Sequence, residues 1–205
     1  MLKRYEDLNE IQLDVLKEIG NIGSGNASTA LSSMIGKEIL IKMPEVKTLA
    51  FQEAIESNGA PDDIVGAILV NLKGDISGMI LMLTEKNFAD VILSAFFGES
   101  DVDLLTLNDN QKSALSEIGN IMSSAYINAI ATLSNLSIAL EPPMFTADML
   151  GAVMSVPITL FGEVGDKLLC INKTIQIDDH EYKSNMLLIP TVESLSVLFS
   201  RLGVS

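Results

Sequence analysis

Apolar and small residues recur at helical spacing between about residues 9 and 36, with polar residues on the opposite side. At 100° per residue one face is predicted to be core and the other open to solvent. The predicted buried face carries Leu16, Ile19, Gly23, Ala27, Ala30 and Met34. The predicted open face carries Asp14, Glu18, Asn21, Gly25, Ser28 and Ser32. A capping box of Asn9 and Gln12 is expected to begin this helix, and Gly36 to end it.

The pattern returns after a shift of 99 residues, from Leu16 to Leu115. Residues 16–22 read Leu-Lys-Glu-Ile-Gly-Asn-Ile, and residues 115–121 read Leu-Ser-Glu-Ile-Gly-Asn-Ile. Four positions repeat at the same spacing: Asp14, Glu18, Asn21 and Pro44 in the first copy, and Ser113, Glu117, Asn120 and Pro143 in the second. A second helix is predicted over 108–135, open at Ser113, Glu117, Asn120 and Ser124 and buried at Leu115, Ile118, Met122, Ala129 and Leu133. The chain therefore contains two copies of one unit.

The remaining pattern completes each copy with strands and further helices. Strands are predicted over 38–50, 64–72, 76–83, 138–140, 167–177 and 182–189. Helices are predicted over 51–56, 87–97, 147–154 and 192–202. We expect a single α+β domain over 1–205 with pseudo-twofold symmetry and a sheet covered by helices. Repeat one spans about 8–98, an acidic connector about 99–107, and repeat two about 108–203.

Composition narrows the classes of partner. The net charge is −14 with only 13 Lys and Arg, which disfavours nucleic acid and anionic membranes. The apolar runs are shorter than a membrane span, no secretory signal is evident, and the single cysteine, Cys170, suits a reducing cytoplasm.

Three glycines lie inside the first predicted helix, at a cost of about 1 kcal/mol each relative to alanine. Gly20 and Gly23 are expected to permit close packing of another element, and Gly25 to keep the polar face low beside Asn21. The alternative for each of the three glycines is a purely structural one, in which the residue serves tight packing and nothing else.

The repeated Glu and Asn have i, i+3 spacing, so they are neighbours on a helix surface. An amide does not ionise near neutral pH and cannot act as a general base, but it can accept a hydrogen bond from water and fix its orientation. Glutamine has this role in GTPases, where it aligns water with a phosphoryl group. A glutamate could bind a partner's lysine or the same water. Neither residue is a nucleophile, so a partner would have to carry the phosphoryl group.

The twice-repeated Asp/Ser, Glu, Asn and Pro pattern resembles the CheC/CheX/FliY family of bacterial chemotaxis phosphatases, and most of all its CheC branch. The resemblance implies a substrate, the aspartyl phosphate of the response regulator CheY, and a second partner, the receptor deamidase CheD. It implies that Glu18 and Glu117 engage the regulator's active-site lysine while Asn21 and Asn120 orient the attacking water. Asp14 and Ser113 would be auxiliary, near the rim of the docked helix. The chain would need no cofactor of its own, because the regulator carries Mg²⁺.

Two other functions stay open at this point. The chain could be a non-catalytic adaptor that binds CheD and phosphorylated CheY, with the acidic and apolar segment 148–153, led by Asp148, as a surface for the deamidase. That segment could equally be an ordinary core helix. The second open function is a binding site for Mg²⁺ or Ca²⁺ at Asp14, Glu18 and Asn21, but one helix face supplies few oxygen ligands.

Overall fold

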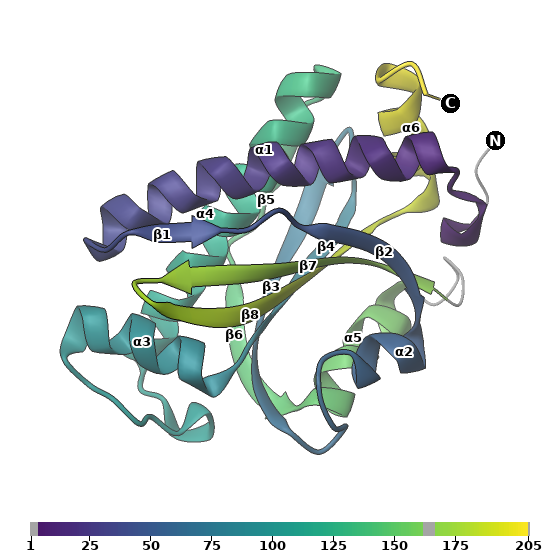
Figure 1. Cartoon of the computed structure of the whole chain (residues 1–205). Coiled ribbons are helices and arrows are strands. Elements are labelled where there is room, and N and C mark those ends of the chain that lie inside the picture. The colour runs from purple at the N-terminus through teal and green to yellow at the C-terminus, as the bar shows by residue number, and fades with distance from the viewer. Residues whose placement is uncertain (1–3, 162–166, 205) are drawn as a thin grey trace.

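The strands of both halves form one antiparallel sheet in the computed structural model, which describes residues 4–161 and 167–204 (Figure 1). The first half contains η1 (Tyr5–Asp7), α1 (Glu10–Ile35), β1 (Ile39–Ile41), β2 (Glu45–Ala50), α2 (Phe51–Glu56), β3 (Ile64–Gly74), β4 (Gly78–Thr84) and α3 (Lys86–Phe97). The second contains η2 (Leu104–Thr106), α4 (Asp109–Ser134), β5 (Ile138–Leu140), β6 (Met144–Met149), α5 (Leu150–Phe161), β7 (Lys167–Ile177), β8 (His180–Pro190) and α6 (Val192–Arg201).

The sheet exchanges its outer strands between the halves. Its order is β1-β7-β8-β4-β3-β5, with β2 also paired to β7 and β6 also paired to β3. Strands β4 and β8 pair at the centre and join the two halves. At one edge β1 and β2 of the first half pair with β7 of the second half. At the other edge β5 and β6 of the second half pair with β3 of the first. The predicted α+β class is confirmed, while a twofold rotation between the halves stays a prediction.

Helices cover both faces of the sheet (Figure 1). Helices α1, α3, α4 and α6 pack on one face, where they form the larger core with residues such as Ile80 and Met82 of β4. The short helix α2 and the first turns of α5 pack on the other face with Met79 and Leu81 of the same strand. Successive residues of β4 point to opposite faces of the sheet, and both faces are covered by helices. All four of these positions are therefore apolar.

Both long helices begin with the same reciprocal cap. In α1 the Asn9 side chain accepts from Gln12 N at 2.9 Å, and the Gln12 side chain accepts from Asn9 N at 3.0 Å. Asn108 and Gln111 repeat this arrangement at the start of α4. Each helix has 26 residues, and the left-handed residues Gly36 and Asn135 end them. The capping box predicted for the first helix is confirmed.

The buried stripes of the two helices differ from the predicted ones at their C-terminal ends. Ala30 is exposed, and Leu31 is fully buried next to it. Leu133, predicted to be core, is 45% exposed. At α1 the reason is the neighbouring strand β1, which shifts the contact surface of the last two turns.

Two serines that were assigned to the open face of α1 bind this strand instead. Ser28 Oγ accepts from Ile41 N, and Ser32 Oγ accepts from Ile39 N, each at 2.9 Å. Both serines are half-buried, so only the N-terminal part of the predicted open face is free of β1.

The predicted bounds of two further segments were also wrong. The strand expected over 38–50 is two strands, which Pro44 separates because it lacks the N–H that a continuous ladder needs. The helix expected over 147–154 begins only at Leu150, and the residues before it belong to β6. Pairing of β6 with β3 overrides the helical tendency of Ala147, Asp148 and Met149.

Close packing at two of the three glycines of α1 is confirmed. A Cβ on Gly20 would lie 2.9 Å from Pro44 Cγ, and a Cβ on Gly23 would lie 2.9 Å from Tyr126 Cγ. Nothing lies within 4 Å of the corresponding position on Gly25. The first two glycines let Pro44 and the α4 side chain Tyr126 contact the backbone of α1, and the third leaves the helix surface low.

We expect a Gly23→Ala substitution to lower the free energy of unfolding by about 1–3 kcal/mol, because the new methyl group would overlap Tyr126. Gly25→Ala is the matched control on the same helix, where the higher helix propensity of alanine should raise stability by up to about 1 kcal/mol. Urea denaturation measures both. Equal effects at the two positions would contradict the close contact at Gly23.

Candidate functional site

The predicted polar ridge of α1 lies at the protein surface. Glu18 is exposed and Asn21 is half-buried one turn later. Their side chains meet, with Asn21 Nδ2 donating to Glu18 Oε2 across 3.4 Å. Asp14 is exposed one turn before the glutamate. At the long end of hydrogen-bond range, this contact holds the amide only weakly.

Helix α4 repeats this arrangement closely. Glu117 is exposed and Asn120 is half-buried, and Asn120 Nδ2 donates to Glu117 Oε2, again across 3.4 Å. Ser113 is exposed one turn before Glu117. The structure thus brings together the predicted residues within each copy, on one exposed ridge per helix.

Each ridge is held outward by the apolar residues that alternate with it. Leu16 and Ile19 on α1 are each 2% exposed, and Leu115 and Ile118 on α4 are each 1% exposed. Because these pairs lie about half a turn from the polar residues, burying them turns the Glu and Asn toward solvent. The amides are therefore accessible to a docking protein.

Asp148 lies apart from both ridges in the chain and in the fold. It is exposed on β6, opposite Val65 of β3, and its Oδ1 accepts from Met149 N at 2.7 Å. Met149 is itself 47% exposed. This carboxylate was predicted on a helix, but it lies on an edge strand of the sheet just before α5.

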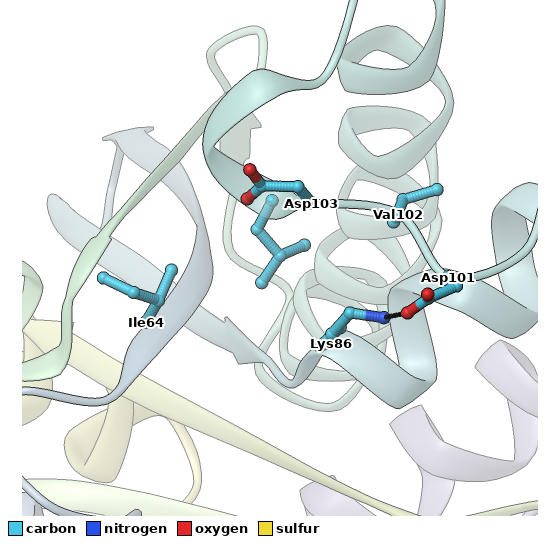
Figure 2. Close-up of a pocket in the computed structure, with 6 residues that line it drawn as sticks. Ile64, Lys86, Asp101, Val102 and Asp103 are labelled. Atoms are coloured by element: carbon cyan, nitrogen blue, oxygen red, sulfur yellow. Dashed lines mark hydrogen bonds and ion pairs between the residues drawn. The ribbon is translucent and has the colours of Figure 1, made fainter.

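A cavity of about 350 Å³ lies at the acidic connector (Figure 2). It is lined by Ile64, Lys86, Asp101, Val102, Asp103 and Leu104, none of which belongs to α1 or α4. Lys86 Nζ donates to Asp101 Oδ1 at 2.7 Å and to Asp90 Oδ2 at 2.8 Å. The hydrogen bond to Asp101 raises the pKa of Lys86 and lowers that of Asp101. The positive charge of Lys86 is thus already balanced by two carboxylates of the chain itself.

Neither a metal cluster nor a membrane-spanning helix is found in residues 4–161 and 167–204. No group of three or more His, Cys, Asp and Glu there is arranged to hold a metal ion. None of the helices in these ranges is long and apolar enough to cross a bilayer.

Sequence reasoning missed a second polar group, located beneath α1 and α4. Ser24 and Tyr126 share a hydrogen bond of 2.6 Å, and Lys173 Nζ lies 4.2 Å from the centre of the Tyr126 ring. A lysine between the apolar inward positions Ile171 and Ile175 of β7 is the signal that could have revealed it.

Comparison with known proteins shows the family of the chain. The sequence model of the CheC-like family matches residues 11–47, and that of the chemotaxis phosphatase CheX matches residues 66–158. The chain is 30% identical to the CheY-P phosphatase CheC of Bacillus subtilis over 98% of both proteins. The chain belongs to the CheC/CheX/FliY family of chemotaxis phosphatases.

Other relatives support the same placement. The flagellar motor switch phosphatase FliY of Bacillus subtilis is 30% identical over 69% of this chain and 37% of its own length. The crystal structure of Thermotoga maritima FliY shares the fold with a TM-score of 0.75 at 21% identity, over 96% of this chain and 98% of that one. As a member of the CheC/CheX/FliY family the chain is a protein phosphatase, a hydrolase.

We expect Asn21→Ala and Asn120→Ala to change the free energy of unfolding by less than about 0.5 kcal/mol. Each amide makes a long contact with an exposed glutamate, and alanine is the better helix former. Urea denaturation of the single variants checks this. A loss above about 1 kcal/mol would assign the asparagines a structural role.

Proposed function

We propose that this phosphatase hydrolyses the aspartyl phosphate of phosphorylated CheY at two sites, with Asn21 on α1 and Asn120 on α4 as the catalytic residues. The observation that carries the proposal is the identical arrangement on two exposed ridges, an accessible amide bound weakly to a glutamate. The substrate is the one named in the relative CheY-P phosphatase CheC. The reaction would take place in the cytoplasm.

The amide orients water in this proposal. On docking, the glutamate exchanges the hydrogen bond from asparagine Nδ2 for one from the lysine of the regulator's active site, which leaves the amide free to turn its oxygen toward a water. The amide oxygen accepts a hydrogen bond from the water and aligns its oxygen with the phosphorus atom. Because a charge-assisted bond to lysine is stronger than the 3.4 Å amide contact, the exchange is favourable.

The chemical step then needs no nucleophile from this chain. Water oxygen forms a bond to phosphorus as the bond from phosphorus to the aspartyl oxygen breaks, and the aspartate leaves as a carboxylate. The proton of the attacking water passes to the released phosphate or to solvent. A hundredfold acceleration corresponds to about 2.7 kcal/mol, which one oriented water in a partly desolvated interface can supply.

Charge on the phosphoryl group would be balanced by the regulator. The chain carries a net charge of −14, and its ridges present Glu18 and Glu117 rather than cations. We therefore assign the Mg²⁺ to the regulator's own carboxylates. Asp14 and Ser113, exposed one turn away, would contact the rim of the docked protein.

A second proposed function is binding of the deamidase CheD at the edge formed by β6. Asp148 and Met149 are both exposed there, so a carboxylate and an apolar side chain occupy consecutive positions of this edge strand. An adaptor without catalysis would form a stable complex with phosphorylated CheY and leave the phosphate lifetime unchanged. Measurement of that lifetime therefore separates adaptor from enzyme.

For the enzyme we expect Asn21→Ala and Asn120→Ala each to remove the phosphate release due to one site, and the double variant to abolish stimulated release from phosphorylated CheY. Loss of an oriented water should cost about a hundredfold at each site. Phosphate release is followed with purified regulator under single-turnover conditions.

Asn26→Ala and Asn128→Ala are the matched controls, since both asparagines are exposed on the same two helices. They should release phosphate at the parental rate. Unchanged release by the Asn21 and Asn120 double variant, with the fold intact, would refute the catalytic proposal.

For the second partner we expect Asp148→Lys to weaken binding of CheD at least tenfold, because it reverses the charge at the centre of the proposed surface. Asp179→Lys, at an exposed turn between β7 and β8, makes the same charge change elsewhere. Calorimetric titration compares the two. Binding of the Asp148 variant at parental affinity would remove this surface from consideration.

A further inference from the structure

A lysine lies in the core beneath the two site helices. Lys173 is the seventh residue of β7 and is 3% exposed. It points to the same face of the sheet as Ile171 and Ile175, which belong to the core under α1 and α4. A buried ammonium without a carboxylate partner is costly, so its presence here calls for a physical reason.

The contacts of the ammonium are with an aromatic ring and a thioether. Its Nζ lies 4.2 Å from the centre of the Tyr126 ring and 3.9 Å from Met186 Sδ. Burial lowers the pKa of Lys173 to about 7, and no charged neighbour contributes to that shift. A cation over an aromatic face is attracted by the ring quadrupole, more strongly when both are desolvated.

Tyr126 transmits this contact to α1. Its ring packs directly on Gly23, and its hydroxyl shares the 2.6 Å hydrogen bond with Ser24. Pro44 packs on Gly20, one turn earlier on the same face of α1, where a Cβ would also lie 4.0 Å from the Tyr126 ring. The turn that carries Asn21 therefore rests on a proline from the β1–β2 segment and a tyrosine from α4, and the lysine lies against the ring of that tyrosine.

The other half of the fold fills the equivalent positions without a charge. Val70 is the seventh residue of β3, a strand of 11 residues like β7. Ala27 is the counterpart of Tyr126, since each is the eighteenth residue of a 26-residue helix. Both are fully buried. The fold itself thus accepts small apolar residues here, and the lysine and tyrosine are specific to one half.

We propose that Lys173 is a positioning residue for the first Glu/Asn pair, and that its ammonium holds Tyr126 against the α1 turn that carries Asn21. The inference rests on the proposed function of that pair. Asn120 lies on α4 itself, six residues before Tyr126 or roughly 9 Å along the helix axis, so a shift of the ring has less effect on it. The two sites therefore respond differently to the protonation of one buried amine.

The sign of the pH dependence follows from the charge state. Below about pH 7 Lys173 is charged and attracts the ring, and above it the neutral amine loses that attraction. The titratable group that faces it from α4 is the Tyr126 phenol, whose pKa burial raises far above this range. On the neighbouring segment from β1 to β2, Lys42 is paired with Glu181 and Glu45 with Lys47, and all four lie at the surface. From β8, Ser184 and Met186 carry no charge.

The test compares the two sites within one protein. Asn120→Ala leaves the first site and Asn21→Ala leaves the second, and each is made with and without Lys173→Met. Phosphate release from phosphorylated CheY is measured from about pH 6 to pH 8, around the pKa of Lys173. The ratio of first-site to second-site rates cancels any pH dependence of the regulator itself.

With Lys173 present we expect this ratio to fall at least threefold between the two pH limits. Lys173→Met should lower first-site release severalfold, change second-site release less than twofold, and make the ratio independent of pH. Lys183→Met, an exposed lysine on β8, is the matched control and should leave both sites unchanged. Equal loss at both sites, or a ratio unaffected by Lys173→Met, would overturn the inference.

Stability distinguishes positioning from a structural role. Because the folded pKa of Lys173 is lowered, the unfolded chain binds more protons above about pH 7, and the free energy of unfolding should rise from there toward the ordinary lysine pKa. Lys173→Met should remove that rise and be at least as stable at neutral pH. A variant that is both less stable and less active would assign the lysine a structural role.

One measurement needs no substitution. The side-chain amide ¹⁵N resonance of Asn21 should titrate with the midpoint of the Lys173 ε-carbon, and that of Asn120 should not. Absence of this shared midpoint would overturn the inference even if the phosphatase proposal holds. Unchanged phosphate release by the Asn21 and Asn120 double variant would instead reject the proposed function and leave the titration result standing.

Discussion

The contact between the backbone of α1 and the Tyr126 ring of α4 is the constraint on which the rest of the site depends. It exists because Gly23 has no side chain at the point of closest approach. A bulkier residue would push the helices apart, and each ridge would tilt relative to the sheet. The glycine cost in helix propensity is offset by this packing and by the Ser24 hydrogen bond at the same turn.

The two ridges owe their likeness to the repeat and their differences to the core. Glu18 with Asn21 and Glu117 with Asn120 have the same contact length, since both follow from i, i+3 spacing on a regular helix. Beneath them one half places a lysine and a tyrosine where the other has valine and alanine. The two ridges therefore present the same Glu and Asn to solvent but differ in the core residues that lie beneath them.

Much of this could be predicted from the sequence, because the helical elements are long and strongly periodic. The capping boxes, the outward ridges and the packing at Gly20 and Gly23 all follow from local spacing. Strand β6 was missed, although a shift of 99 residues carries the first-half segment 45–50 onto 144–149. A local pattern cannot predict which strand a helix contacts. The contact of Ser28 with β1 and the contact of Lys173 with Tyr126 therefore appear only in the tertiary structure.

The exchange of outer strands has a consequence for synthesis of the chain on the ribosome. Glu45 of β2 pairs with Asn172 of β7, which emerges much later. At roughly 5–20 residues per second, the strand waits on the order of ten seconds for its neighbour to be translated. Contacts so distant in sequence also slow the search for the native topology. The architecture that unites the two halves thus leaves β2 of the nascent chain without its hydrogen-bonding partner until β7 has been translated.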